Sequence, residues 1–392
     1  MLRYFFVYFL VLLITQTNLA KANEELEKIF QEAQTFSTQE QYDEAIRLFR
    51  FMLSINPNLL RPRLELAKNL YLNKDYDTAE HQFSRVLSTV SDVNVQKNIL
   101  RYIQRIQQEL PQINLSIALI TDSNPSQKTS EEFINIGGLL FRFVNPEAEK
   151  IYGTSLKLNT KIPMKKNFFL KTYFENNNFP GADMDRLYLV NYFGRHIPLS
   201  PKTTFTPEIG AHSYFSNSDK VFDGNNIGLK LRNRIDKKSV IEVESKVQEY
   251  NYINQARYDG VKKPLSFIYQ YNPNSKSNLY ISLSNLISKS DDKSLSFINK
   301  SLTLGYTQEV NKGFQVGLKA RFSNESYEDE HIFFGVKRED KFKNYELSFL
   351  NNLFQIEGVA PKLIIGKTVN DSNIPLNAYE KTYTKIEFTT KY

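Results

Sequence analysis

The last twelve residues of the chain, Lys381 to Tyr392, alternate strictly between two kinds of side chain. One face is apolar or threonine and includes Phe388 and Tyr392, and the other face is charged or polar. Such period-two alternation indicates a β-strand with two different surroundings. Either an amphipathic strand of a soluble sheet or the closing strand of an outer-membrane barrel would satisfy it. In the second interpretation, Phe388 and Tyr392 form the terminal-strand signal for barrel assembly.

Strands and turns alternate from residue 133 to the end, and their connections differ systematically in length. Short turns are expected at 163–166, 198–202, 236–238, 272–276, 311–313 and 355–358, and longer polar loops at 144–150, 176–184, 215–223, 251–260, 289–296, 326–340 and 371–380. Short turns on one side and long loops on the other are typical of an outer-membrane barrel, here of about 14 antiparallel strands. A soluble β-sandwich need not sort its turns by length, so we predict a barrel over residues 133–392.

Residues 24–110 have helical periodicity and an internal repeat. Five positions recur at an offset of 34 residues, the period of tetratricopeptide (TPR) repeats. The matched pairs are Ala33 and Ala67, Tyr42 and Tyr76, Asp43 and Asp77, Ala45 and Ala79, and Phe49 and Phe83. A further helix at 93–109 is expected to cap the stack. We therefore predict a periplasmic TPR domain over 23–110.

TPR helix pairs usually form a concave surface that holds a peptide or a partner protein. The first helix of each unit lines this surface, and this position predicts Gln34, Arg61, Lys68 and Tyr71 as cargo-binding residues. The alternative is that these four residues are ordinary solvated helix positions.

The remaining segments complete the predicted domain organisation. Residues 1–22 combine Arg3, an apolar run from Tyr4 to Ile14 and the small-x-small pattern at Ala20 to Ala22, which predicts a secretory signal peptide. Residues 111–132 are expected to be a linker, an added strand or a plug segment. The predicted fold class is multidomain α plus β, with helical TPR repeats followed by a transmembrane antiparallel barrel.

The composition argues against chemistry at a catalytic site. The chain has no cysteine, which excludes thiolate metal sites and cysteine nucleophiles. The four histidines lack metal-ligand spacing, and we expect no catalytic residues, metal or cofactor. His212 shares a strand face with Glu208, so an inward acid–imidazole pair is conceivable, but a polar lumen wall explains both residues. The net charge of +7 comes from lysines and arginines spread along the chain, which does not suggest nucleic acid.

Three carboxyl-terminal segments carry a resemblance to a known family. They are Phe334 to Asp340, Gly358 to Leu363, and Asp371 to Lys381. With the signal peptide, TPR repeats and barrel, they resemble the Slam family of surface lipoprotein assembly modulators. The resemblance implies an outer-membrane translocon that delivers protein cargo to the cell surface, either lipoproteins or soluble haem-binding-type proteins.

The same resemblance implies the partners of the protein. Cargo and periplasmic chaperones would meet the TPR domain, while barrel-assembly machinery and outer-membrane lipid would meet a monomeric barrel. Two alternatives remain open from the residues. One is a TPR-barrel porin for polysaccharide export, and the more distant one is a barrel hydrolase that uses His212.

Overall fold

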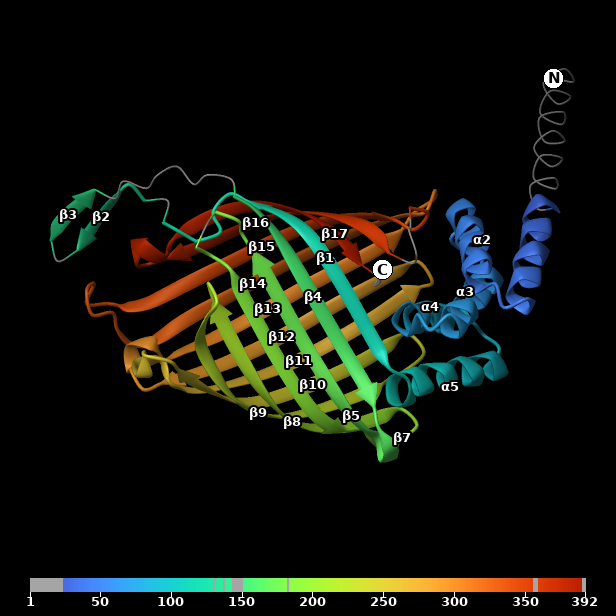
Figure 1. Cartoon of the computed structure of the whole chain (residues 1–392), viewed down its shortest axis with the longest axis horizontal. Helices are drawn as coiled ribbons and strands as arrows, with labels where there is room; N and C mark the ends of the chain where they lie inside the picture. Colours follow the sequence, from blue (N-terminus) through green and yellow to red (C-terminus); the bar gives the residue numbers. More distant parts are fainter. Residues whose placement is uncertain are drawn as a thin grey trace, which may run out of the picture.

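A computed structural model describes residues 24–129, 131–136, 138–142, 151–181, 183–354 and 359–389. It shows a small helical domain seated at one end of a long β-barrel (Figure 1). The predicted signal peptide, residues 1–22, lies outside the described residues, as does Tyr392. The predicted fold class is confirmed.

The helical domain has the predicted TPR arrangement. A helix over residues 24–38 precedes α2 (Tyr42–Ile55), α3 (Leu60–Leu72), α4 (Tyr76–Thr89) and α5 (Val93–Glu109). The small repeated residues allow the helices to approach closely, because Ala33, Ala45, Ala67 and Ala79 are all 0% exposed. The repeated aromatic residues Phe49 and Phe83 fill the core between the helices and are also 0% exposed.

Side-chain caps define where the later helices begin. The Asp75 carboxylate accepts a hydrogen bond from Thr78 N at the start of α4, and the Asp92 carboxylate accepts from Asn94 N and Val95 N at the start of α5. Such caps satisfy backbone donors that lack a partner within the helix. Helix α5 buries Ile99, Ile103 and Ile106, and it therefore covers the last apolar face of the stack as predicted.

Fourteen antiparallel strands form a closed ring, in which the first strand pairs with the last. The order follows the chain, except that the short β7 (Ile197–Ser200) pairs with β8 beside the ring. The ring consists of β1 (Gln112–Asp122), β4 (Ile151–Pro163), β5 (Phe168–Asn178), β6 (Arg186–Arg195), β8 (Thr203–Ser216), β9 (Asp219–Arg234), β10 (Ser239–Tyr252), β11 (Gly260–Asn274), β12 (Ser277–Ser290), β13 (Phe297–Glu309), β14 (Phe314–Glu330), β15 (Lys337–Asn351), β16 (Ala360–Ser372) and β17 (Tyr379–Thr389).

The barrel begins earlier than predicted. Residues 112–122 lie in the segment 111–132, for which a linker, an added strand or a plug is expected, and they form β1, which pairs with both β17 and β4. The segment from residue 133, which we expected to be the first barrel strand, is instead a separate hairpin of β2 (Phe133–Ile136) and β3 (Leu139–Arg142). The ring still has the predicted fourteen strands, because β1 takes the place of the strand that was expected after residue 133.

The connections whose residues the structure describes are sorted by length as expected, with one exception, and the predicted loop at 144–150 and turn at 355–358 lie outside the described residues. Residues 215–223, predicted as a long loop, contain only a tight turn at Asn217 and Ser218, whose φ angles are 48° and 73°. Two successive positive φ angles suit a two-residue hairpin turn, and β8 and β9 extend up to it. The helical domain lies at the end of the barrel where the short turns are (Figure 1).

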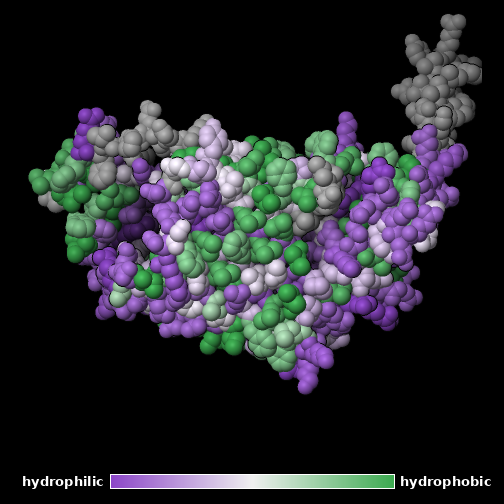
Figure 2. Space-filling model, viewed as in Figure 1, coloured by the Kyte–Doolittle hydropathy of each residue, from purple (hydrophilic) through white to green (hydrophobic). Residues whose placement is uncertain are grey.

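The outer face of the barrel is apolar over its middle. On β1, for example, Ile113, Leu115, Ile117 and Leu119 are all more than 40% exposed, whereas the intervening Ala118 is 5% exposed. Figure 2 shows hydrophobic residues gathered over the strands and hydrophilic residues over the helical domain. In the part of the chain that the structure describes, no helix has the length and apolar character needed to cross a membrane.

The described part of the last strand has the predicted two faces. Ile386 and Phe388 are both 41% exposed on the outer face, and Phe388 lies opposite Ile117 of β1. The intervening Glu387 carboxylate accepts a hydrogen bond from Ser116 Oγ at 2.6 Å. The outward position of Phe388 is therefore a geometric fact, whereas its role as an assembly signal stays a prediction.

Candidate functional site at the TPR–barrel junction

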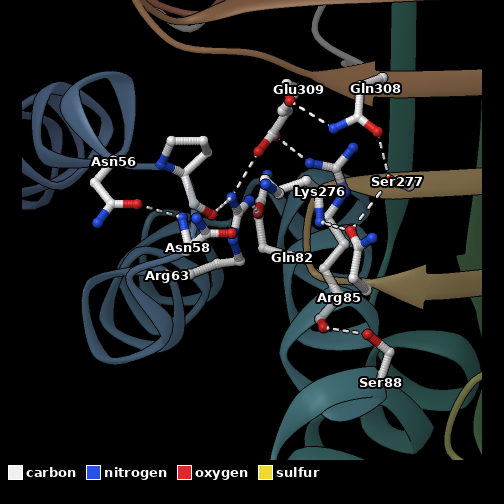
Figure 3. Close-up of polar contacts among 12 residues, drawn as sticks. Asn56, Asn58, Arg63, Gln82, Arg85, Ser88, Lys276, Ser277, Gln308 and Glu309 are labelled. Carbon is white, nitrogen blue, oxygen red and sulfur yellow. Dashed lines mark hydrogen bonds and ion pairs between the residues drawn. The ribbon is translucent and has the colours of Figure 1, made fainter.

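A buried cluster of three charges joins the helical domain to the barrel (Figure 3). Arg63 of α3 and Arg85 of α4 are both 0% exposed, and Glu309 at the end of β13 is 7% exposed. Arg63 Nη2 lies 2.6 Å from Glu309 Oε2, and Arg85 Nη1 pairs with Glu309 Oε1. Each oxygen of one carboxylate thus receives one guanidinium. We call these three residues the docking cluster.

Neighbouring groups hold the docking cluster in place. Arg63 also donates to Gln82 Oε1 and to Pro57 O, both at 2.8 Å. The turn that follows β13 adds a backbone contact, in which Lys312 N donates to Ser54 O at 2.6 Å. Burial lowers the pKa of the Arg85 guanidinium, and the Glu309 carboxylate opposes this shift. Two buried arginines are tolerable here because a carboxylate compensates them.

Further polar contacts place α4 and α5 across the mouth of the barrel. On one side, Lys161 Nζ of β4 donates to Gln107 O of α5 at 2.6 Å. On the other side, Arg232 of β9 lies 3.5 Å from Glu80 of α4, and α4 packs against β11. Counted around the ring, β4 is the second strand and β11 the eighth, so they lie nearly opposite each other. The helical domain therefore spans the opening at the short-turn end.

A cavity of about 260 Å³ lies behind this helical cap, inside the barrel. Its lining is polar and charged and includes Glu80 and Gln107 from the helices and Lys171, His196, Lys230 and Glu242 from the wall. Lys230 Nζ lies 3.2 Å from Glu242 Oε1, so part of the positive charge of the wall is balanced by acidic residues. The interior behaves as a polar lumen, as an outer-membrane barrel requires.

His212 does not form the acid–imidazole pair that its position on the strand face suggested. Its ring is 2% exposed, and Nδ1 lies 3.0 Å from Asn226 Oδ1. Glu208 instead faces Lys246, at 3.6 Å. In the described residues, no three or more His, Asp or Glu side chains come together as metal ligands.

The four residues predicted to bind cargo lie on the first helix of each repeat, with Gln34 on the helix over residues 24–38 and the other three on α3. Arg61 is exposed and stacks over the Phe30 ring at 4.3 Å, and Gln34 is half-buried on the neighbouring helix. Lys68 pairs with Glu65 at 2.8 Å. Tyr71 is partly buried against Tyr76 and Tyr102, and burial raises its pKa. The structure thus leaves Arg61 and Lys68 accessible, and gives Tyr71 a packing role.

A wide groove remains open beside the cap. It measures about 570 Å³ and lies between α2, the start of α4 and the start of β1. Charged side chains line it, including Asp43, Arg47, Lys74 and Asp77, together with Ile113 of β1. Sequence reasoning found neither this groove nor the docking cluster. Arg63 and Glu309 are 246 positions apart, and no local pattern connects them.

The fold and this junction define a class, an outer-membrane β-barrel with an amino-terminal TPR domain. Residues 199–392 match the sequence profile of the surface lipoprotein assembly modifier family, and residues 10–83 match its profile for the N-terminal TPR repeats. The chain belongs to the surface lipoprotein assembly modifier family, and the predicted resemblance is confirmed.

Two relatives agree with this assignment. Surface lipoprotein assembly modifier 1 of Haemophilus influenzae is 21% identical over 364 residues, which cover 90% of this chain and 74% of that protein. The surface lipoprotein assembly modifier of Pasteurella multocida is 21% identical over 390 residues, covering 89% and 73%.

Solved structures of outer-membrane channels are similar to this chain at low TM-scores. The channel DcaP of Acinetobacter baumannii has a TM-score of 0.41 at 9% identity, covering 71% of this chain and 97% of that one. The toluene transporter TodX of Pseudomonas putida has a TM-score of 0.38 at 8% identity, covering 74% and 91%. Similarity at this level transfers no property to this chain.

Proposed function

We propose that this protein is an outer-membrane translocon that delivers specific protein cargo from the periplasm to the cell surface. The cargo class is surface lipoproteins, as the names of its relatives suggest, or soluble haem-binding-type proteins. The observation that carries the proposal is the docking of the TPR domain across the short-turn mouth, because it places a protein-binding module at the entrance of a polar lumen.

The orientation of the barrel follows from the same contacts. Short turns face the periplasm in outer-membrane barrels. The TPR domain contacts strand ends and turns on the short-turn side, including Lys237, whose Nζ donates to Val90 O at 3.2 Å. The domain therefore works in the periplasm, where it receives cargo or its chaperone, and the long loops face outward.

The concave face is the proposed receiving surface. The docking cluster uses side chains of α3 and α4 that point toward the barrel, and it leaves Arg61 and Lys68 accessible. The positive charge of Arg61 favours a passenger segment with acidic residues, which would compete with Glu65 for Lys68. Because α4 and α5 cover the mouth, cargo that enters the lumen must displace the cap or pass through the neighbouring groove.

A proteomic comparison tests the function. Protease-accessible surface proteins and culture supernatant are compared between cells with and without the gene. We expect one or a few proteins to disappear from outside and accumulate in the periplasm. An unchanged set of external proteins together with reduced surface polysaccharide would refute the proposal in favour of polysaccharide export.

A pair of matched variants tests the receiving surface. Arg61→Ala/Lys68→Ala removes two positive charges from the proposed receiving surface, and the control Lys97→Ala/Arg101→Ala removes two charges from exposed positions on α5 outside the groove. We expect the first variant to reduce surface delivery of the identified cargo several-fold, with normal barrel levels. Equal delivery by both variants would exclude these residues from cargo binding.

A further inference from the structure

Lysines are distributed unequally around the outer face of the barrel. Near the long-loop end of β11 to β16, outward positions carry lysines, which are Lys263, Lys289, Lys300, Lys341, Lys343 and Lys367, and Lys289 pairs with Glu328. The same half of β4 to β10 has no outward lysine or arginine among its described residues, and it carries Asp223 and Glu249. One side of the barrel is therefore basic at the level where lipid headgroups begin.

Salt bridges neutralise part of this basic side. Lys343 pairs with Asp371, and Lys367 pairs with Glu380, both at 2.9 Å. Lys300 is exposed, and its outward direction follows from Ile298 and Leu304 on the same strand face, which are 43% and 38% exposed. Lys300 lies only three residues from the start of β13, at the long-loop end.

Lys300 stands at the polar edge of an outward-facing groove. The groove measures about 610 Å³ and crosses β11 to β14. Leu265, Phe267, Leu283, Leu302 and Phe322 form its apolar floor. Asn285 of β12 and Asn324 of β14 lie directly opposite Lys300 in the strand register, one on each side. Opposite residues have Cβ atoms about 5 Å apart, so the three polar groups form one row.

Asn285 adds an independent observation. Its Oδ1 atom is buried, and it has no hydrogen-bond partner among the described residues. A buried acceptor without a donor is unfavourable, and a ligand that draws the Asn285 amide into the groove can supply that donor. The row therefore offers a cation at Lys300, amide groups on both sides, and an unused acceptor.

We propose that this groove binds a phosphorylated, acylated glycolipid of the outer leaflet, of the lipid A type. The lipid phosphate contacts Lys300, hydroxyl or amide groups of the sugar contact Asn285 and Asn324, and an acyl chain lies on the apolar floor. Charge-assisted hydrogen bonds make the phosphate the main determinant of affinity. The assignment rests on the orientation in the proposed function, which places this end of the barrel in the outer leaflet.

The polar row distinguishes this lipid from another acylated candidate. The lipid anchor of a lipoprotein cargo has acyl chains but no phosphate, so it would leave Lys300 without a counter-charge. The basic surroundings of Lys300, which include Lys263 and Lys341, favour an anionic headgroup over a neutral one.

Binding to the purified full-length protein in detergent tests this inference. The protein is titrated with diphosphorylated lipid A, with dephosphorylated lipid A and with a diacylated lipopeptide, and bound lipid is counted by native mass spectrometry. We expect saturable binding of the diphosphorylated form and about tenfold weaker binding by Lys300→Ala, the loss appropriate to one charge-assisted contact. The control Lys165→Ala removes an exposed lysine at the TPR end and should bind like wild type.

Two results of the titration would contradict the proposed lipid site. Equal affinity of Lys300→Ala and wild type would overturn the assignment, as would equal binding of dephosphorylated lipid A or of the lipopeptide. Loss of an outward lysine should not impair barrel formation, because the lipid-facing surface favours apolar residues. The assay contains no cargo, so failed cargo delivery in cells would refute the proposed function without affecting this result.

Discussion

The docking cluster makes a quantitative prediction about the position of the TPR domain. Glu309→Ala removes the carboxylate that compensates Arg63 and Arg85, both of which are 0% exposed. Breaking a buried ion pair by removing one partner costs about 3–5 kcal/mol. The undocked state avoids this cost because both guanidinium groups return to water. The equilibrium should therefore shift toward the undocked state by about a hundredfold to a few thousandfold.

Distance measurements between two spin labels can detect this shift. The chain has no cysteine, so Lys97→Cys on α5 and Lys165→Cys in the turn after β4 provide two unique labelling sites. Double electron–electron resonance should give a single narrow distance distribution in the wild-type background and a broad one with Glu309→Ala. Glu328→Ala is the control, because it breaks an exposed ion pair with Lys289 at the far end, which contributes about 0–1 kcal/mol.

A second variant tests whether docking needs the three charges or only the absence of an uncompensated one. Arg63→Met/Arg85→Met/Glu309→Leu replaces the whole docking cluster with apolar residues of similar size. Replacing a complete buried ion cluster in this way is often neutral or stabilising, so the narrow distribution should return. A narrow distribution in Glu309→Ala itself would show that other contacts hold the domain and that the cluster is energetically minor.

The remaining predictions concern the stability of the two parts. Fragment 23–110 should fold alone with a helical circular dichroism spectrum, and Phe83→Ala should destabilise it by about 3–5 kcal/mol in urea denaturation, as expected for a fully buried aromatic side chain. Burial raises the pKa of Asp75 in the folded protein. The contribution of this carboxyl group to the free energy of unfolding is therefore fully present below its ordinary pKa, and it is lost as the pH rises through its pKa in the folded protein. Asp75→Asn keeps a capping oxygen, and its melting temperature should exceed that of wild type at about pH 7 but not at about pH 3. Phe388→Ala/Tyr392→Ala should reduce barrel levels in the outer membrane, and normal levels would contradict the terminal-strand signal. Leu318→Ala, on the outer face of β14, is the control for this last measurement.

Local patterns predicted much of this fold because they reflect local geometry. The offset of 34 residues identified the alanines and aromatic residues that pack between helices, since each repeat uses the same contacts. Alternation and turn length predicted the barrel, and the strand number agrees because the missed β1 is offset by the strand wrongly expected after residue 133. The tight turn at Asn217 and Ser218 was missed because β8 and β9 continue into a polar stretch that resembles a loop.

Long-range pairing explains what the sequence did not reveal. The apolar alternation of Ile113, Leu115, Ile117 and Leu119 was visible, but its closing partner β17 begins at Tyr379. Nothing local distinguishes such a strand from a linker. Arg63 and Arg85 likewise occupy ordinary helix positions, and only the fold brings Glu309 to them. Pattern reasoning therefore predicted the elements but not the junction between the domains.

The location of Glu309 on the tenth strand of the ring has a consequence for biogenesis. The TPR domain precedes the barrel in the chain, yet its anchoring carboxylate is made only after most strands are present. A barrel that lacks β13 therefore offers the helical domain Lys161 and Arg232 but leaves Arg63 and Arg85 without Glu309. Docking through the cluster thus requires assembly at least as far as β13, whereas closure of the ring waits for β17 to pair with β1.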